Sequence, residues 1–240
     1  MGYRPSDPRL GELADAVHGC RRCPRLNAWR DEAAANPPRR FLGEEYWAKP
    51  ISGFGDPAAR IMVVGLAPAA NGANRTGRVF TGDRSGDWLF ASLHRTGFAN
   101  QPVSIAVDDG LELTNIWVTA AVKCAPPANK PLISERDNCL PWFERELELL
   151  DRVTVFVALG GFAWDAVIRS IRALGGEVPR PKPRFGHGEV TTVGRWTMIG
   201  SFHPSQQNTF TGRLTEPMTD DVFMRAAELA GAAAPREVAG

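Results

Sequence analysis

Apolar, β-favouring runs alternate along most of this chain with longer segments of helical periodicity, and this alternation constrains the fold more than any other feature. Each apolar run ends at a turn rich in Gly, Pro or Asn. Strands that alternate with helices pair in parallel through crossover connections, and helices then cover both faces of the sheet. The pattern predicts an α/β fold with a mostly parallel, four-stranded sheet. The expected strands are residues 61–66, 116–122, 153–159 and 196–201, and the expected helices are 87–96, 134–150, 162–174 and 218–229.

Length and composition indicate an ordinary globular protein. The chain has 240 residues, of which 43% are hydrophobic and 23% charged, and these values argue against disorder, collagen-like repeats and coiled coils. We expect a single domain over residues 1–230, followed by a flexible tail of small residues at 231–240.

The charge balance excludes a strong global field. Twenty-eight basic and 27 acidic residues leave a net charge of +1, so a nucleic acid or an anionic membrane would have to be met by a local patch. No stretch approaches the roughly 20 apolar residues that cross a bilayer. Residues 1–8 also lack the apolar core of a secretory signal, so we expect a cytoplasmic protein that does not bind membranes.

Four cysteines raise the question of metal binding. Cys20 and Cys23 form a C-x2-C pair, whereas Cys124 and Cys139 are separated by fourteen residues. Four thiolates can close one tetrahedral site, and the long second gap fits a [4Fe-4S] cluster better than a structural zinc ion. Spacing alone does not decide between them. The alternative is four unrelated buried thiols, because free cysteine is often buried.

The loops that follow the strands at Leu66, Val122 and Ser201 should meet at one cleft, because ligands bind beyond the carboxyl ends of parallel strands. The first of these loops, at residues 65–83, is rich in small residues and lets a ligand approach the backbone closely. It imitates a P-loop, but Arg78 stands in place of the lysine and Val79 in place of the magnesium-binding hydroxyl. We therefore reject nucleoside triphosphate binding.

Two stretches free of acidic residues suggest a basic surface at this cleft. Residues 57–82 and 190–215 contain no Asp or Glu, and a local positive surface of this kind suits the phosphates of a nucleic acid. The alternative for either stretch is a solvated polar loop. The cationic candidates are Arg60, Arg75, Arg78, Arg195, Arg213 and His203.

His203 is followed by Pro204 at the end of the last expected strand. A histidine fixed there can donate a hydrogen bond to an oxygen that gains negative charge, and the polar side chains beyond it can probe base edges or fill a gap in a duplex. The alternative is a histidine with a purely structural role.

Several motifs together resemble those of the family 5 uracil-DNA glycosylases. The resemblance lies in the segments 65–69 (GLAPA), 74–83 (NRTGRVFTGD), 123–127 (KCAPP) and 203–205 (HPS), together with the cysteine spacing, and extends from Cys20 to about Leu229. It implies a three-layer α/β/α fold and a structural [4Fe-4S] cluster held by Cys20, Cys23, Cys124 and Cys139. It also implies a monomeric DNA-repair enzyme that hydrolyses the N-glycosidic bond of uracil, and of other deaminated or damaged bases such as hypoxanthine.

The resemblance also assigns roles to individual residues. The flipped base would stack on Phe80, Asn129 would lie near the base or the attacking water, and His203 would stabilise the departing base. Arg213 would contact a phosphate. Residues that would line the pocket are Gly65, Leu66, Ala67 and Ala69, and residues that would fill the duplex are Ser205, Gln206, Gln207, Asn208 and Thr209.

The first motif contains no general base, so we expect Asp83, the nearest downstream carboxylate, to orient water or to balance the cationic sugar. Asp83 could equally be a turn residue or a helix cap. Because the motif lacks an acid, a noncatalytic protein that binds damaged DNA is the alternative function. Ala120 stands where sister families hold a base-reading Asn, which predicts loose discrimination among bases.

Overall fold

A six-stranded sheet runs through the centre of the computed structural model, which describes residues 2–231. The strand order is β1-β3-β2-β4-β6-β5. The four central strands are parallel to one another, as expected, and almost all of their residues are buried. They are β2 (Ile61–Gly65), β3 (Ile116–Ala120), β4 (Val155–Leu159) and β6 (Trp196–Ser201).

The sheet has two strands more than predicted, and both are short antiparallel strands at its edges. β1 (Phe54–Gly55) pairs with β3, and β5 (Val190–Val193) pairs with β6. Neither has the continuous apolar character of a buried strand, since β1 has only two residues and β5 is mostly exposed or half-buried. The predicted four strands therefore describe the parallel centre of the sheet and not its edges.

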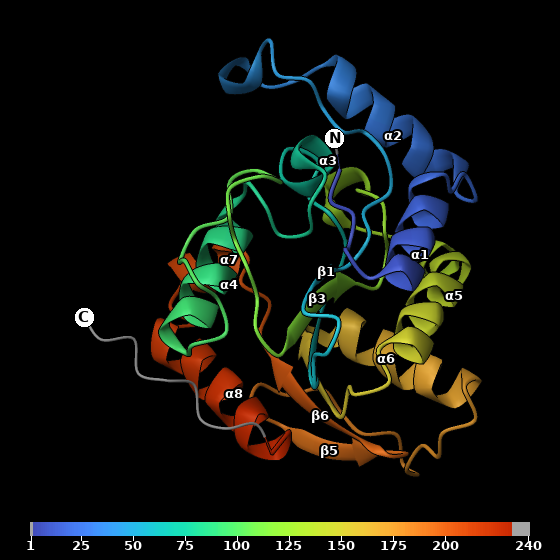
Figure 1. Ribbon diagram of the computed structural model, residues 1–240, viewed down its shortest axis with the longest axis vertical. Helices are drawn as coiled ribbons and strands as arrows, with labels where there is room; N and C mark the ends of the chain where they lie inside the picture. The colour runs from blue at the N-terminus through green and yellow to red at the C-terminus, as the bar shows by residue number, and fades with distance from the viewer. Residues whose placement is uncertain (1, 232–240) are drawn as a thin grey trace.

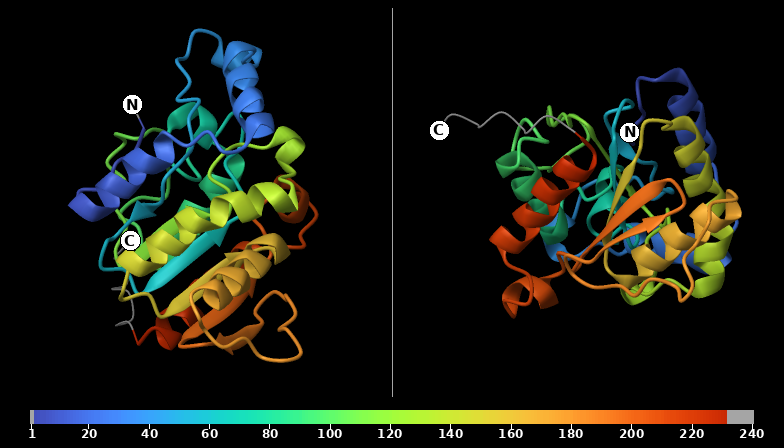
Figure 2. Two further views of the ribbon diagram at one scale, coloured as in Figure 1. Left: turned by 90° about the vertical axis from the view of Figure 1, so that its right-hand side faces the viewer. Right: turned by 90° about the horizontal axis from the view of Figure 1, so that it is seen from below.

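Helices cover both faces of the sheet and form the two outer layers (Figure 1). On one face α4 (Arg84–Arg95) packs beside α8 (Glu216–Leu229). On the other face α5 (Ile133–Leu149) lies between α1 (Pro8–His18) and α6 (Gly161–Ala173), as Figure 2 also shows. Alternate residues of each central strand enter one of the two helical layers, so Val63 contributes to one core and Val64 to the other. The four predicted helices are confirmed, with ends within a few residues of those expected.

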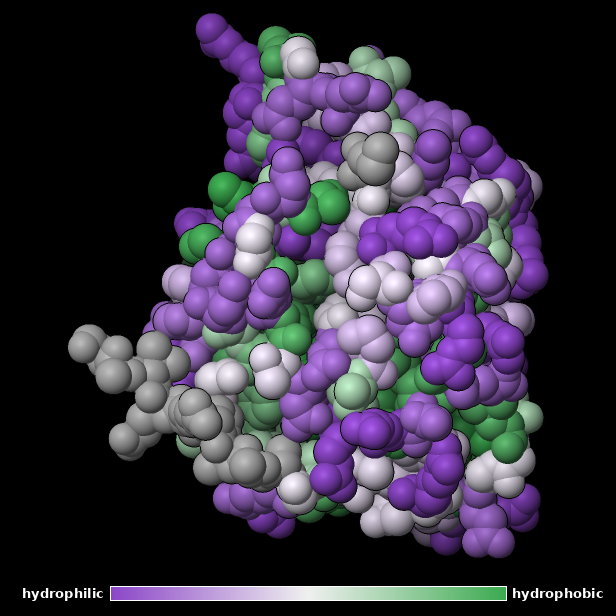
Figure 3. All heavy atoms as spheres, viewed as in Figure 1, coloured by the Kyte–Doolittle hydropathy of each residue, from purple (hydrophilic) through white to green (hydrophobic). Residues whose placement is uncertain are grey.

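The remaining helical elements lie toward the carboxyl edge of the sheet (Figure 1). They are α2 (Pro24–Ala35), η1 (Arg39–Phe41), α3 (Ala73–Thr76), η2 (Pro127–Asn129) and α7 (Gln206–Phe210). The face shown in Figure 3 is largely hydrophilic, with hydrophobic residues visible in patches between polar side chains. Among the described residues no helix is long and apolar enough to cross a membrane. Nearly all of the predicted tail, residues 232–240, lies outside the described residues.

Candidate active site

A cavity of about 550 Å³ opens at the carboxyl ends of the central strands, where the loops after β2, β3 and β6 meet. This is the cleft that the strand pattern predicts. Ten of the predicted site residues line it: Leu66, Ala67, Ala69, Phe80, Asp83, Asn129, His203, Ser205, Gln206 and Gln207.

The loop after β2 forms an apolar wall of the cavity. Leu66, Ala67, Pro68 and Ala69 all line it. Backbone hydrogen bonds hold this loop against the loop after β3, including one from Val122 N to Leu66 O at 3.1 Å. The wall is therefore fixed to the sheet by its backbone and presents small or aliphatic side chains to a ligand.

Gly65 does not line the cavity, in contrast to its predicted role, because the ring of Phe80 covers it. A Cβ atom at residue 65 would lie 2.6 Å from Cζ of Phe80. Phe80 is 8% exposed and has a left-handed backbone with φ +52°. Its carbonyl lies so close to Gly86 that a side chain there would overlap it. Glycine at both positions permits the placement of the Phe80 ring at the cavity.

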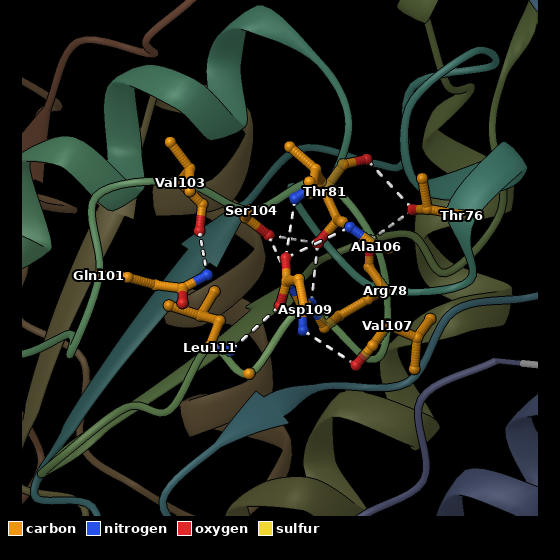
Figure 4. A network of polar contacts seen from close by, with 12 residues as sticks. Thr76, Arg78, Thr81, Gln101, Val103, Ser104, Ala106, Val107, Asp109 and Leu111 are labelled. Carbon is orange, nitrogen blue, oxygen red and sulfur yellow. Dashed lines mark hydrogen bonds and ion pairs between the residues drawn. The ribbon is translucent and has the colours of Figure 1, made fainter.

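A buried polar network holds the loop that carries Phe80 (Figure 4). Arg78, which is 1% exposed, forms an ion pair with Asp109 at 2.7 Å and donates to the Ser104 hydroxyl at 2.8 Å. It also donates to the Thr81 hydroxyl at 3.0 Å, and this bond joins the two residues that lie on either side of Val79 and Phe80. Asp109 in turn accepts three backbone N–H bonds from its own loop. The network ties residues 78–81 to the loop that contains Asp109.

Asp83 is a helix cap, one of the alternatives that its sequence position suggests, and it also lines the cavity. It is the N-cap of α4, with Oδ1 accepting from Ser85 N at 2.9 Å and from Gly86 N at 3.0 Å. Its Oδ2 atom has no hydrogen bond within residues 2–231, and the residue lines the cavity. Burial raises the pKa of the Asp83 carboxyl, and the two backbone donors oppose this shift. One carboxylate thus caps a helix and offers a free oxygen to the cavity.

His203 also lines the cavity, two residues after the end of β6. Its ring centroid lies 6.1 Å from that of Phe80. Burial lowers the pKa of His203 to about 4, so the imidazole is neutral at pH 7. A neutral imidazole still has one N–H to donate. The backbone carbonyl of His203 accepts from the Asn208 side chain at 2.8 Å, which fixes the turn after Pro204.

Asn129 lines the cavity from η2, where its backbone is left-handed with φ +54°. Asn208 and Thr209 do not line the cavity. Arg213 does not line it either, and its guanidinium lies over the ring of Phe202 at 4.5 Å.

The predicted basic surface is largely wrong. Arg78 is buried in the ion pair with Asp109, and Arg75 is mostly buried and pairs with Glu44 at 2.6 Å. Arg60 and Arg195 immediately precede β2 and β6, so they lie at the amino ends of strands whose carboxyl ends form the site. Of these five arginines, only Arg213 is both exposed and in a loop at the carboxyl edge.

Three residues near the site had no role in the sequence interpretation. Arg84 lines the cavity at the first residue of α4, and its guanidinium lies 5.9 Å from the ring of Phe210, which is 71% exposed. His187 accepts from Phe202 N at 3.1 Å and stacks on the Phe202 ring, next to His203. An exposed aromatic after a polar run could have indicated Phe210, but the pairing of His187 with residue 202 depends on the tertiary fold.

The four cysteines line one small cavity beside the active-site loop. Cys20 and Cys23 lie at the turn between α1 and α2, Cys124 follows β3, and Cys139 lies within α5. All four are free thiols. Burial raises the pKa of Cys124 to about 11 and that of Cys139 to about 12. As the side chains lie, no group of three or more His, Cys, Asp or Glu residues in the described chain could hold a metal ion.

Donors already point at three sulfur atoms of this cavity. Arg30 Nη1 donates to Cys124 Sγ at 3.3 Å, Lys123 N donates to Cys139 Sγ at 3.2 Å, and Asn138 Nδ2 lies 3.8 Å from Cys23 Sγ. N–H donors around sulfur stabilise thiolates, because charge-assisted hydrogen bonds are stronger than neutral ones. The donor set suits a group held by four thiolates.

Comparison with known proteins identifies relatives of this chain. A family model described as "Uracil DNA glycosylase superfamily" matches residues 52–227. A type-5 uracil-DNA glycosylase of Mycobacterium tuberculosis is 52% identical over 222 residues, which cover 92% of this chain and 81% of that protein. The type-5 uracil-DNA glycosylase of Thermus thermophilus is 48% identical over 220 residues, covering 91% and 97%, and that of Pyrobaculum aerophilum is 45% identical over 220 residues, covering 92% and 93%. The chain belongs to the uracil DNA glycosylase superfamily, within the group of type-5 uracil-DNA glycosylases.

Proposed function

We propose that this chain removes uracil from DNA by hydrolysing the N-glycosidic bond, which leaves an abasic site for base excision repair. One observation carries the proposal: Phe80, Asp83 and His203 line the same cavity at the carboxyl edge of the sheet. A base within a duplex cannot reach such a cavity, so the target nucleotide leaves the stack before the reaction. The relatives named above are uracil-DNA glycosylases, which supports the same activity.

The leaving base is stabilised by His203. Cleavage of the bond between C1′ and the base nitrogen places negative charge on the base and its carbonyl oxygens. The neutral imidazole of His203 donates its N–H to such an oxygen, and this bond strengthens as the charge develops. The ring of Phe80, held by the Arg78–Asp109 network, offers a flat surface on which the flipped base stacks.

Asp83 acts on the deoxyribose, the other partner in the bond that breaks. Its free Oδ2 atom orients a water molecule toward C1′ or balances the positive charge that the sugar gains as the base departs. The water oxygen bonds to C1′, its proton is released, and the base leaves as an anion that is later protonated. Oδ1 remains bound to the start of α4, so the carboxylate is held without a lysine or arginine partner.

The site accepts deaminated bases other than uracil, such as hypoxanthine. The wall at residues 66–69 carries only aliphatic side chains, which offer a base no side-chain hydrogen bond. Ala120, the last residue of β3, is buried and does not line the cavity, in contrast to the base-reading position expected for it. An enzyme rejects a wrong base strongly when that base leaves buried polar groups of the site without hydrogen bonds. A site with few such groups discriminates weakly. Ser205, Gln206 and Gln207 at the rim face the DNA, and Arg213 meets a backbone phosphate.

We further propose that Cys20, Cys23, Cys124 and Cys139 hold a [4Fe-4S] cluster. The four thiols share one cavity and are surrounded by N–H donors, and a cube of iron and sulfide spaces its thiolates more widely than a single ion does. When bound, the cluster would crosslink the α1–α2 turn, the loop after β3 and α5. The Cys124 loop is hydrogen-bonded to the wall of the active site through Val122.

A strand-cleavage assay tests the activity. A duplex with one uracil is incubated with excess protein and treated with alkali, which cuts the strand wherever an abasic site has formed. Uracil-dependent cleavage supports the proposal, and its absence at saturating protein concentration refutes it. The same assay on a duplex with hypoxanthine tests whether the site accepts other deaminated bases. Cleavage at uracil but not at hypoxanthine would overturn that proposal. Iron and acid-labile sulfide content test the cluster.

A further inference from the structure

Four cationic side chains are buried in the described part of the chain, and one of them differs from the rest. Arg78 pairs with Asp109 at 2.7 Å, Lys123 with Glu146 at 2.8 Å, and Arg136 with Asp137 at 2.8 Å. The fourth, Arg30, is 0% exposed and forms no ion pair with a carboxylate within residues 2–231.

The Arg30 guanidinium has a single hydrogen-bond partner, the Sγ atom of Cys124 at 3.3 Å. Its Nε and Nη2 atoms are buried without any partner within residues 2–231. Burial of an unpaired charge is costly enough that buried cations are found paired or beside a metal centre. Arg30 therefore lacks the negative charge that its environment requires.

The position of Arg30 shows where that charge belongs. Leu26 and Arg30 are the only buried residues of α2, and they lie four residues apart on one face of the helix. Leu26 lines the cavity of the four cysteines, and Arg30 contacts one of the four. An ion pair between Arg25 and Glu135 at 2.7 Å fastens the same helix to α5, which carries Cys139.

We propose that Arg30 is the buried counter-charge of the centre held by the four cysteines, and that its guanidinium raises the reduction potential of this centre and slows its loss. This inference rests on the proposed [4Fe-4S] cluster. Four thiolates give such a cluster a net negative charge, and reduction by one electron adds another. A fixed positive charge beside Cys124 stabilises the reduced cluster more than the oxidised one. It also stabilises the bound cluster, in either state, relative to the released one.

Arg30 also connects the cluster to the active-site loop. Its backbone carbonyl accepts from the Asn74 side chain at 3.4 Å, and Asn74 lies in α3, between the cavity wall and Phe80. The other atom of that amide, Oδ1 of Asn74, is buried without a partner among residues 2–231. A side-chain substitution at Arg30 leaves this backbone hydrogen bond to the catalytic loop in place, whereas it changes the contact with Cys124 directly.

The test compares the cofactor itself in four proteins: wild type, Arg30→Met, Arg30→Lys and Arg78→Met. Arg78→Met is the matched control, because it also removes a fully buried arginine but one whose charge is balanced by Asp109. The midpoint potential is measured by mediated titration, and cluster loss to an iron chelator is followed by visible absorbance. For Arg30→Met we expect the equilibrium constant for reduction to fall at least tenfold, or about 59 mV for one electron, and iron loss to accelerate at least tenfold. Arg30→Lys should stay within about threefold of wild type in both. Arg78→Met should match wild type in midpoint potential at a temperature where it remains folded, because Arg78 does not line the cysteine cavity.

Each outcome separates this inference from the proposals beneath it. Equal potentials and equal loss rates for wild type and Arg30→Met would overturn the role of Arg30 and leave the cluster intact. Wild-type protein without iron would refute the cluster itself, whatever its glycosylase activity. If Arg30→Met does not fold, Arg30→Gln replaces it, since glutamine keeps a donor for Cys124 and removes the charge.

Discussion

The carboxylate of Asp83 lies directly against the backbone of Gly72, so closely that a Cβ atom at residue 72 would overlap Oδ2. The loop after β2 thus approaches the start of α4 at the one carboxylate of the site. Oδ1 is held by the helix and Oδ2 is confined between Gly72 and the cavity. These contacts fix the orientation of the Asp83 carboxylate, as the catalytic role that we propose for it requires.

Asp83→Asn should separate capping from chemistry. Asparagine caps a helix about as well as aspartate, so the melting temperature should stay the same or rise, since a buried charge has been removed. The single-turnover rate on a uracil duplex should fall about 100-fold to 1,000-fold. Asp83→Ala should lose a similar amount of rate and, in addition, about 1 kcal/mol of the free energy of unfolding. An Asn variant as active as wild type would reduce Asp83 to a cap.

Gly72→Ala should displace the Asp83 carboxylate without removing it. We expect a rate loss of about tenfold or more, because small misplacements of a catalytic group are costly. In the Asp83→Asn background the same substitution should cost much less, and this non-additivity is the decisive readout. Gly161→Ala is the control, since a Cβ there would meet its nearest neighbours at 3.8 Å. Additive losses would show that Gly72 acts elsewhere.

The rate should show no pH-dependent step near 6.5. Because the pKa of His203 is lowered to about 4, its imidazole is neutral throughout pH 5 to 8 and its contribution is constant there. Burial raises the pKa of the Asp83 carboxyl, so a loss of rate on the acid side should begin at a higher pH than for an ordinary Asp. Single-turnover rates across this range measure both effects. A rate that rises as the pH falls through 6.5 would indicate a protonated histidine instead.

The buried histidines should make the folded chain less stable as the pH falls, whereas a histidine in a salt bridge makes it more stable. Burial lowers the pKa of both His18 and His203 to about 4, below the unfolded value of about 6.5. Between these values the unfolded chain binds more protons, so the free energy of unfolding should decrease as the pH falls from 6.5 toward 4. Denaturant titrations of wild type and of His18→Gln should show a shallower decline in the variant. Identical slopes would contradict a neutral, buried His18.

Asp109→Asn should reveal how strongly the buried network holds Phe80. The substitution leaves the Arg78 guanidinium buried without its counter-charge, which typically costs about 3 to 5 kcal/mol of unfolding free energy. At a temperature where the variant remains folded, base binding should weaken, because the loop from Arg78 to Thr81 loses its anchor. Denaturant titration and KM on a uracil duplex provide the two readouts. A stable variant with unchanged KM would show that the network does not hold Phe80 in position.

The parallel centre of the sheet could be predicted because its strands are buried on both faces and read as continuous apolar runs. β5 could not, because only Val193 of its four residues is buried. The site was largely predictable, since strand topology brings the loop after β2 and the loop at His203 to one edge. The basic surface was not, because Arg78 finds its partner Asp109 thirty-one residues further along the chain. The monomeric state and the cytoplasmic location stay predictions.

The single-turnover rate of His203→Ala on a duplex with one uracil, measured at saturating protein, tests the central claim most directly. A hydrogen bond to a developing oxyanion contributes roughly 2 to 4 kcal/mol, so the rate should fall about thirtyfold to a thousandfold while DNA affinity changes little. Arg213→Ala should show the reverse, with weaker and less salt-sensitive binding and a nearly normal rate at saturation. If His203→Ala cleaves as fast as wild type once bound, the histidine is only a DNA contact. If neither wild type nor variant releases uracil, the chain is a noncatalytic binder of damaged DNA.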